Sequence, residues 1–123
     1  MHIEAFREHC MAVKGATEST PFIDPDVVVF KVMDKMFAML ALTPKDGIHK
    51  ADLKCDPDYT LELRERYEGI GPSHIKTTLL WNRIVLASDV PDALIRSLIN
   101  HAVEEVVKKL PKKKQAEYAN MPG

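Results

Sequence analysis

The sequence predicts an α+β fold, a two-layer sandwich in which helices pack on a single antiparallel sheet. Helical periods of apolar residues alternate along the chain with β-branched or period-two segments. Most of the predicted strands follow one another through short links, which favours antiparallel pairing. Amphipathic helices need an apolar surface to pack on, and the sheet supplies it. We therefore expect the order α-β(3)-α-β(2)-α.

The first helix is expected at residues 3–14, and Gly15 suits the C′ position that ends a helix. Its apolar residues recur at three- and four-residue spacing and would form the buried face: Ile3, Phe6, Cys10 and Val13. The following segment, 16–26, is rich in threonine and proline and allows only a short extended piece.

Three strands are expected next, at 27–32, 35–42 and 48–55. The first is β-branched and aromatic, which is typical of a strand. Met33 and Asp34 would form a tight turn between the first two, although such turns usually contain glycine. The third strand alternates with period two, so one set of side chains should share a solvent-facing side: Lys50, Asp52 and Lys54.

The second helix is predicted at 56–69. Asp56 would be its N-cap, and Pro57 occupies the first helical position, where its missing N–H costs nothing. Gly69 would close the helix. The segment after it, 70–77, should be irregular or a short strand.

The chain is predicted to end with a strand at 81–88 and its longest helix at about 91–110. Asp89 would cap this helix, and Pro111 would stop it. Its apolar residues fall on one face: Ile95, Leu98, Ile99, Ala102, Val106 and Leu110.

The length of 123 residues suits one domain and is short for two. We expect this domain at 1–111, followed by a basic and loosely ordered tail at 112–123. The formal net charge is −1, so any attraction for nucleic acid has to be local. Two isolated cysteines, a charged N-terminal segment and the lack of a long apolar stretch predict a cytoplasmic protein that does not contact a membrane.

Two groups of basic residues could contact phosphates. The first is the set of five lysines within 108–114. Cations at the end of a helix also oppose its dipole favourably, which is the simpler explanation of this group. The second would share the sheet face turned away from the helices, where a solvated sheet needs polar residues in any case: Lys31, Lys50, Lys54 and, depending on register, Arg83.

The sequence favours neither a metal site nor catalysis. No two of the five histidines have the i, i+4 spacing of a helical ligand pair. The GxSxG, GxxxxGK[ST] and GxGxxG motifs are absent. Cys10 lies on the apolar stripe of the first helix, where a thiol is inert. We therefore predict a protein that is not an enzyme and has no cofactor and no metal.

Trp81 is the only tryptophan of the chain and stands at the start of a predicted strand. A tryptophan in this position is more often an anchor in a core than a platform on which bases stack. Asn82 and Arg83 follow it directly, so a binding surface at this point stays open as the alternative.

Several stretches together resemble the MmcQ/YjbR family, also described as DUF419. The combination of "LKC-DP", a strand that opens with Trp-Asn and a last helix that ends in "KLPKK" is distinctive. The resembling stretches are "FREHC" (6–10), "VFKVMDKMFAML" (29–40), "LKCDPDYTLELRERY" (53–67), "WNRIVL" (81–86) and "DVPDALIRSLINHAVEEVVKKLPKK" (89–113).

The resemblance implies a CyaY-like or secretion-chaperone-like fold and a "double wing" surface proposed to contact DNA. Members commonly carry a polar His-x-Asn-Lys stretch before the tryptophan, where this chain has "IKTTLL" at 75–80. The family's binding role is therefore carried over only to Lys76, Trp81 and Asn82.

Two functions follow as hypotheses. The first is a DNA-binding domain that makes weak, salt-dependent contacts with phosphates. The second is a protein-interaction module, in which Leu79 and Leu80 would receive a protein partner or a second copy of the chain. The residues predicted to contact nucleic acid are Lys31, Lys54, Lys76, Trp81, Asn82, Arg83, Lys112 and Lys113.

Overall fold

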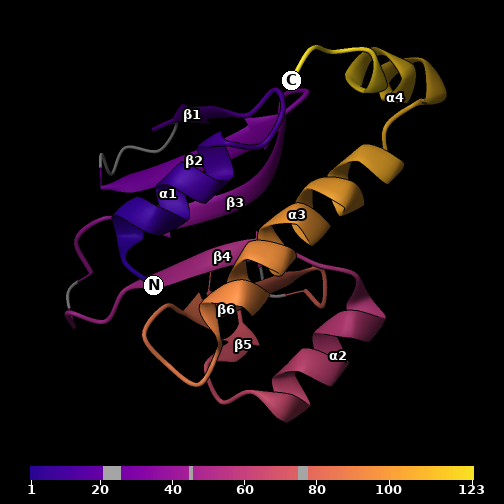
Figure 1. Cartoon of the computed structure of the whole chain (residues 1–123). Coiled ribbons are helices and arrows are strands. Elements are labelled where there is room, and N and C mark those ends of the chain that lie inside the picture. Colours follow the sequence, from indigo (N-terminus) through magenta and orange to yellow (C-terminus); the bar gives the residue numbers. More distant parts are fainter. Residues whose placement is uncertain (21–25, 45, 75–77) are drawn as a thin grey trace.

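The computed structural model describes residues 1–20, 26–44, 46–74 and 78–123. Its elements follow the predicted order, with an additional short strand after the first helix and an additional helix at the end (Figure 1). In chain order they are α1 (Ile3–Met11), β1 (Thr17–Ser19), β2 (Val27–Val32), β3 (Lys35–Ala41), β4 (Lys50–Lys54), α2 (Pro57–Arg66), β5 (Ile70–Pro72), β6 (Trp81–Val85), α3 (Asp92–Lys108) and α4 (Lys112–Ala119).

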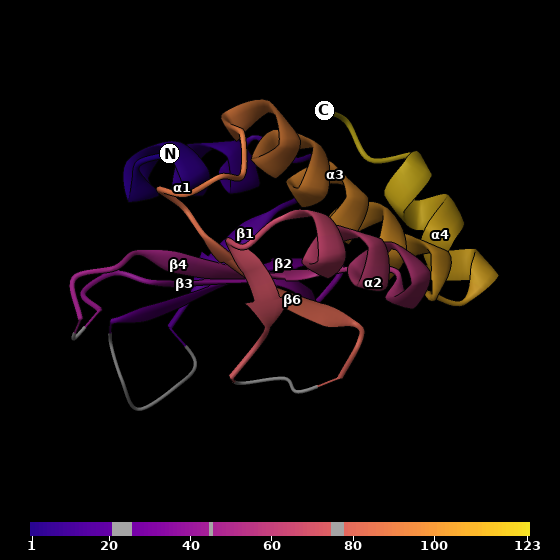
Figure 2. The ribbon, with the colours of Figure 1, turned by 90° about the horizontal axis from the view of Figure 1, so that it is seen from below.

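The strands form one six-stranded sheet in the order β1-β2-β3-β4-β6-β5, and each neighbouring pair is antiparallel. The helices lie on one side of the sheet (Figure 2). The opposite side, called the outer face below, carries no helix among the described residues. The predicted α+β two-layer sandwich is thus confirmed. None of the described helices is both long and apolar enough to cross a bilayer.

The turn between β2 and β3 is as tight as predicted, and it uses no glycine. Met33 and Asp34 both adopt positive φ, at 51° and 64°. Positive φ at both central residues is the signature of a type I′ turn, whose twist matches that of the two flanking strands. The turn therefore fixes the position of Lys35, which directly follows it as the first residue of β3.

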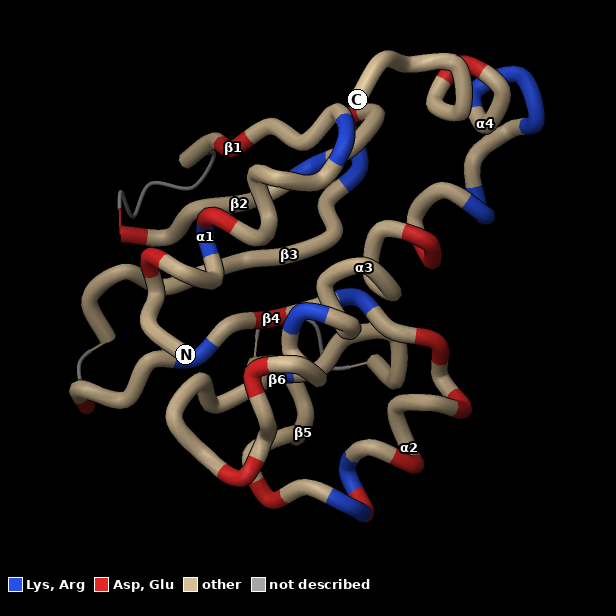
Figure 3. Tube along the Cα trace, viewed as in Figure 1, with Lys and Arg blue, Asp and Glu red and all other residues tan. Residues whose placement is uncertain are grey.

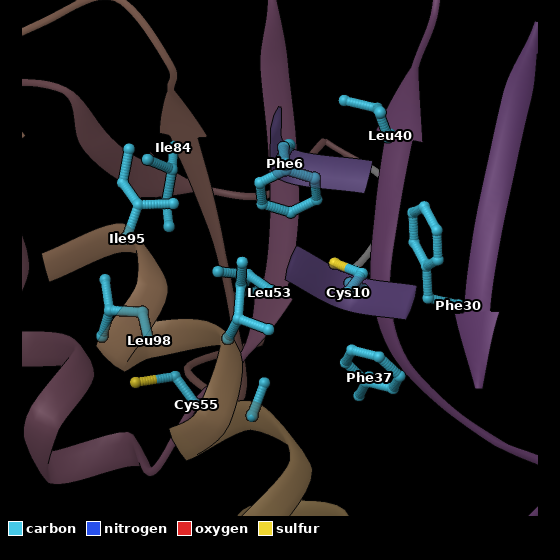
Figure 4. Packing of buried hydrophobic residues seen from close by; sticks show 14 of the residues in the cluster. Phe6, Cys10, Phe30, Phe37, Leu40, Leu53, Cys55, Ile84, Ile95 and Leu98 are labelled. Carbon is cyan, nitrogen blue, oxygen red and sulfur yellow. The ribbon is translucent and has the colours of Figure 1, made fainter. Parts of the chain in front are cut away.

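The main core lies between the sheet and the helices (Figure 4). Phe6 of α1 meets Phe30 of β2 edge to face, with ring centroids 6.4 Å apart. Burying each large apolar side chain contributes roughly 1.5–3 kcal/mol. The labelled side chains of Figure 4 come from both layers: Phe6, Cys10, Phe30, Phe37, Leu40, Leu53, Cys55, Ile84, Ile95 and Leu98.

The prediction that Asp89 caps the last helix is wrong. α3 starts at Asp92, and its N-cap is Pro91. The Asp89 carboxylate instead accepts hydrogen bonds from the backbone N–H groups of Glu68 and Gly69, both at 2.8 Å. These bonds hold the pKa of Asp89 below its usual value. The residue thus ties the end of the α2–β5 connection to the segment before α3.

The segment 112–123, expected to be loosely ordered, contains α4. The hydroxyl of Tyr118 donates a hydrogen bond of 2.7 Å to the carbonyl oxygen of Lys14, just beyond α1. The Lys14 ammonium lies 4.7 Å from the centre of the same ring. α4 is therefore attached to the domain at its C-terminal end by Tyr118.

Candidate nucleic-acid interface

The outer face carries the basic residues that the alternation predicted. Lys31 lies between two core residues of β2 and points to the opposite side. The register places Lys54 opposite Trp81, and Asp52 opposite Arg83. The four side chains of this part of β4 and β6 therefore lie next to one another on the outer face, and the register question about Arg83 is settled.

The same face nevertheless has a small apolar core of its own. Val29, Met39 and Trp81 form it, with exposed fractions of 0%, 1% and 6%. Met36 and Leu80 are partly buried against them. Trp81 is an anchor, as its position favoured, but it anchors this second cluster and not the main one. A ring so well covered cannot stack on a base.

Asp52 lies at the centre of the outer face, in the row Met39–Asp52–Arg83. Burial raises the pKa of its carboxyl above the usual value, while a hydrogen bond with Ser73 and the charge of Arg83 act in the opposite direction. The Arg83 guanidinium therefore faces an acid of its own sheet. The middle of this face is less attractive to phosphate than its count of basic residues suggests.

Asn82 does not belong to any exposed surface, so its prediction as a nucleic-acid contact is wrong. The side chain is 2% exposed and points toward the helices. Its amide nitrogen donates to the Thr60 hydroxyl at 3.0 Å, and its oxygen accepts from Arg64 Nε at 2.8 Å. Arg64 also donates to the carbonyl oxygen of Trp81 at 3.1 Å. Asn82 thereby fixes α2 to the sheet.

A different basic site lies at the end of the sandwich. Lys35 at the start of β3, Lys54 at the end of β4 and Lys109 at the C-cap of α3 line one hollow of about 230 Å³. Val106 and Leu110 form its apolar wall. The chain then enters α4, whose first residues are Lys112, Lys113 and Lys114. We call these six lysines the lysine rim, and the space between the first three the rim hollow.

Figure 3 places the basic residues of the α3 end, the start of α4 and the β2–β3 hairpin at the same end of the molecule. In the described part of the chain, no carboxylate lies within 4.0 Å of the Lys35 or Lys109 ammonium. Their neighbour Lys108 is different, because it pairs with Glu105 at 2.6 Å and with Asp56 at 3.9 Å. Lys35 and Lys109 therefore keep charges that no close carboxylate of the described residues compensates.

The remaining predicted residue, Lys76, falls outside the described residues. Lys112 and Lys113 are exposed on α4 and belong to the rim. Sequence reasoning missed Lys35, and it considered Lys109 only as one of the five lysines within 108–114. Lys35 directly follows the predicted tight turn, and Lys109 lies at the end of the predicted last helix. Only the fold brings these two positions, which are 74 residues apart, to one hollow.

No metal centre is visible in the ranges that the structure covers, where no three histidine, cysteine or acidic side chains are grouped. His101 accepts a hydrogen bond of 3.1 Å from the backbone N–H of Asp56 and packs edge to face on Tyr59. Both cysteines are buried, and burial raises the pKa of each thiol. A buried thiol with a raised pKa is a poor nucleophile.

The YjbR family model matches residues 11–104. The chain therefore belongs to the YjbR family. This match includes Lys35 and Lys54 of the rim, whereas Lys109 and the lysines of α4 lie beyond it.

Two further comparisons agree with this membership. Among curated proteins, this YjbR chain is 31% identical over 101 residues to "Uncharacterized protein YbdF" of Escherichia coli O157:H7, which covers 77% of this chain and 81% of that protein. The crystal structure of the Deinococcus radiodurans protein DR2400, described as a DUF419 domain, is similar with a TM-score of 0.85 and 28% identity, covering 98% of this chain and 88% of that one.

A Pseudomonas syringae protein solved by crystallography has the same fold, with a TM-score of 0.71 and 23% identity. The match covers 83% of this YjbR chain and 96% of that structure. None of these descriptions names a ligand or a reaction.

Proposed function

We propose that this YjbR domain is a non-catalytic DNA-binding domain whose phosphate contacts come from the lysine rim. This places the interface at the end of the sandwich and away from the middle of the outer face. Lys54 belongs to both regions. Lys31, at the hairpin end of β2, lies opposite Met36 on the outer face and would extend the rim toward β1.

The observation that carries the proposal is the position of Lys112, Lys113 and Lys114. They occupy the first turn of α4, which contains no acidic residue. Cations at a helix N-terminus are unfavourable, by about 0.3–1 kcal/mol each, because the dipole is positive there. Helix-end stabilisation thus explains Lys108 and Lys109 at the end of α3, but it fails for these three. A bound phosphate would relieve their repulsion.

The proposal predicts weak binding that depends steeply on salt. Each phosphate that a lysine neutralises releases condensed counterions, so affinity falls as salt rises. Sequence-independent binding of this kind has a Kd of about 10⁻⁴–10⁻⁶ M at physiological salt. The net charge of −1 supplies no long-range attraction to strengthen it.

Fluorescence anisotropy with a labelled duplex tests the proposal. The native chain should bind at low salt, and the slope of log K against log [salt] should decrease by about one for each lysine removed in K112Q/K113Q/K114Q. The matched control is Lys50→Gln, at the other end of β4, whose ammonium pairs with Asp46 at 2.9 Å. No binding at micromolar protein and low salt, or equal losses in both variants, would refute the proposal.

The alternative is a protein-interaction module or homodimer. It is supported by a hollow of about 660 Å³ at the end opposite the rim, lined mostly by apolar side chains such as Ala5, Ile48 and Val85. Ile48 is 47% exposed, and Leu79, at a separate place on the surface, is 41% exposed. Light scattering over a range of concentrations distinguishes the cases. A dimer weakened by Ile48→Asp supports this alternative, and a concentration-independent monomer contradicts self-association.

A further inference from the structure

We propose that the rim hollow binds a phosphate monoester, the terminal phosphate of a strand or of a small molecule, in preference to a backbone diester. As a contact for nucleic acid this rests on the proposed function; as a site for small phosphate esters it stands alone. The hollow is bounded by lysines from three separate elements: Lys35 of β3, Lys54 of β4 and Lys109 at the end of α3.

The charge of the site matches a dianion better than a monoanion. A phosphate monoester carries about −1.5 to −2 at pH 7, whereas a backbone diester carries one charge. Lysines from three elements line one hollow, and a ligand with a larger charge offsets more of the repulsion between them. Two acids of the neighbouring elements, Glu105 and Asp56, pair with Lys108.

Another acid, Asp34, does not line the hollow. Asp34, at the tip of the β2–β3 turn, belongs to a separate hollow of about 200 Å³ that also includes Gly15 and Lys114. The side of the rim hollow that α3 forms is apolar, with Val106 4% exposed and Leu110 6% exposed. An apolar wall excludes water and strengthens charge interactions next to it.

The shape of the site also favours a terminal group. A hollow with lysines on three elements and an apolar wall admits a group that projects into it from one attachment point. A diester continues on both sides and needs an open groove that follows the strand. The first turn of α4 begins two residues after Leu110, and its lysines do not line the hollow.

The protein contains its own reporter for this site. The Lys54 ammonium lies 5.9 Å from the centre of the Trp81 ring, within the range of a cation–π contact. Trp81 is the single tryptophan of the chain. A phosphate that draws Lys54 toward the hollow changes the surroundings of this ring, so its fluorescence should follow binding.

The test compares three probes with the full chain: a duplex with 5′-phosphates, the same duplex with 5′-hydroxyls, and ribose 5-phosphate. The phosphorylated duplex should bind about fivefold more tightly, the effect in water of the one additional charge that a monoester brings near a lysine when it replaces a backbone diester in the hollow. Ribose 5-phosphate should change the Trp81 emission. Both effects should weaken when the pH falls from about 7 to 5, because the monoester then loses its second charge.

The variant K35Q/K109Q should remove the fivefold preference and the response to ribose 5-phosphate, and Lys50→Gln should keep both. Lys35 and Lys109 are both exposed, so K35Q/K109Q should still fold. The midpoint of its thermal unfolding verifies this. A preference that survives in K35Q/K109Q overturns the inference.

The outcomes separate this inference from the proposed function. Equal binding of the two duplexes, with no response to ribose 5-phosphate, refutes the monoester site and leaves the DNA-binding proposal standing. A response to ribose 5-phosphate without any duplex binding supports the hollow and refutes the DNA-binding proposal. Failure of all three probes refutes both.

Discussion

The outer face of the sheet and the lysine rim are both rich in cations, but they differ in what surrounds those cations. On the outer face, Arg83 faces Asp52 of the neighbouring strand, and Trp81 is covered within an apolar cluster. At the rim, Lys35 and Lys109 converge on a hollow with no acid in its wall. A surface rich in lysine and arginine is therefore a candidate site only where its charges remain uncompensated and converge.

From this comparison we expect the outer face to contribute to stability and the rim to bind ligand. Variants of the first region should change the free energy of unfolding, and variants of the second should change affinity alone. Variants at Trp81, Asp52 and the pair Lys35 and Lys109 test this division, and variants of the buried Asn82 test its exclusion from the interface.

Trp81→Ala should have the largest effect. Truncating a buried tryptophan costs about 3–5 kcal/mol, because it removes apolar burial and leaves a cavity among Val29 and Met39. Urea unfolding followed by circular dichroism measures the loss. Lys31→Gln on the same face is the control, and it should stay within about 0.5 kcal/mol of the native chain. A loss below about 1 kcal/mol for Trp81→Ala would mean that the second cluster contributes little to stability.

Asn82→Ala should cost about 1–3 kcal/mol, because it leaves Arg64 and the Thr60 hydroxyl without their partner in a buried position. Asn82→Asp keeps an oxygen for Arg64 and loses only the donor to Thr60, so its loss should be smaller. Chemical denaturation of both variants checks the order. At a temperature where both variants are folded, their affinity for DNA should equal that of the native chain. A loss of affinity in a folded variant would show that Asn82 contributes to the interface.

Asp52→Asn should change stability in a way that depends on pH. Burial raises the folded-state pKa of Asp52, so the folded chain holds its proton more tightly than the unfolded one. The native chain therefore loses stability as pH rises from about the ordinary value of 3.8 through that raised pKa. The asparagine variant lacks this loss and should therefore be more stable than the native chain at pH 7.

The measurement for Asp52→Asn is the difference in unfolding free energy between variant and native chain from pH 7 down to pH 3. The difference should shrink as the pH falls. A difference that grows on acidification would mean that the attraction of Arg83, and not burial, dominates at Asp52.

K35Q/K109Q should have the smallest effect on stability, at most about 0.3–1 kcal/mol, because both side chains are exposed and only Lys109, at the C-cap of α3, opposes a helix dipole. The same variant is expected to alter phosphate binding. Thermal unfolding and anisotropy on one preparation check the two statements together. A large loss of stability would show that the rim is part of the structure and would weaken its assignment as a site.

Most of the architecture could be predicted from local patterns. Period-two alternation placed Lys50, Asp52 and Lys54 on one face, and the β-branched run 27–32 became β2 as expected. Asp56 caps α2 as predicted, accepting hydrogen bonds from the N–H groups of Asp58 and Tyr59. These features depend on residues a few positions apart, which the sequence displays directly.

The errors concern residues whose role depends on a distant partner. Aspartate is a residue type that often caps helices, which favoured Asp89 as the N-cap. Its carboxylate instead accepts hydrogen bonds from the N–H groups of Glu68 and Gly69. Asn82 was expected beside Trp81 on one surface, although adjacent residues of a strand face opposite sides. The family resemblance kept the two together as a motif, and the pleat of the strand separates them.

Local sequence patterns were enough to predict the helices α1, α2 and α3, most of the strands, the antiparallel sandwich and the resemblance to the family. The tertiary structure alone decided which charges are compensated and which converge. Lys35, Lys54 and Lys109 come from three elements, and their common hollow exists only because strand register and helix packing bring the ends of those elements together. Local propensity acts over a few residues, whereas electrostatic fields depend on distance through space.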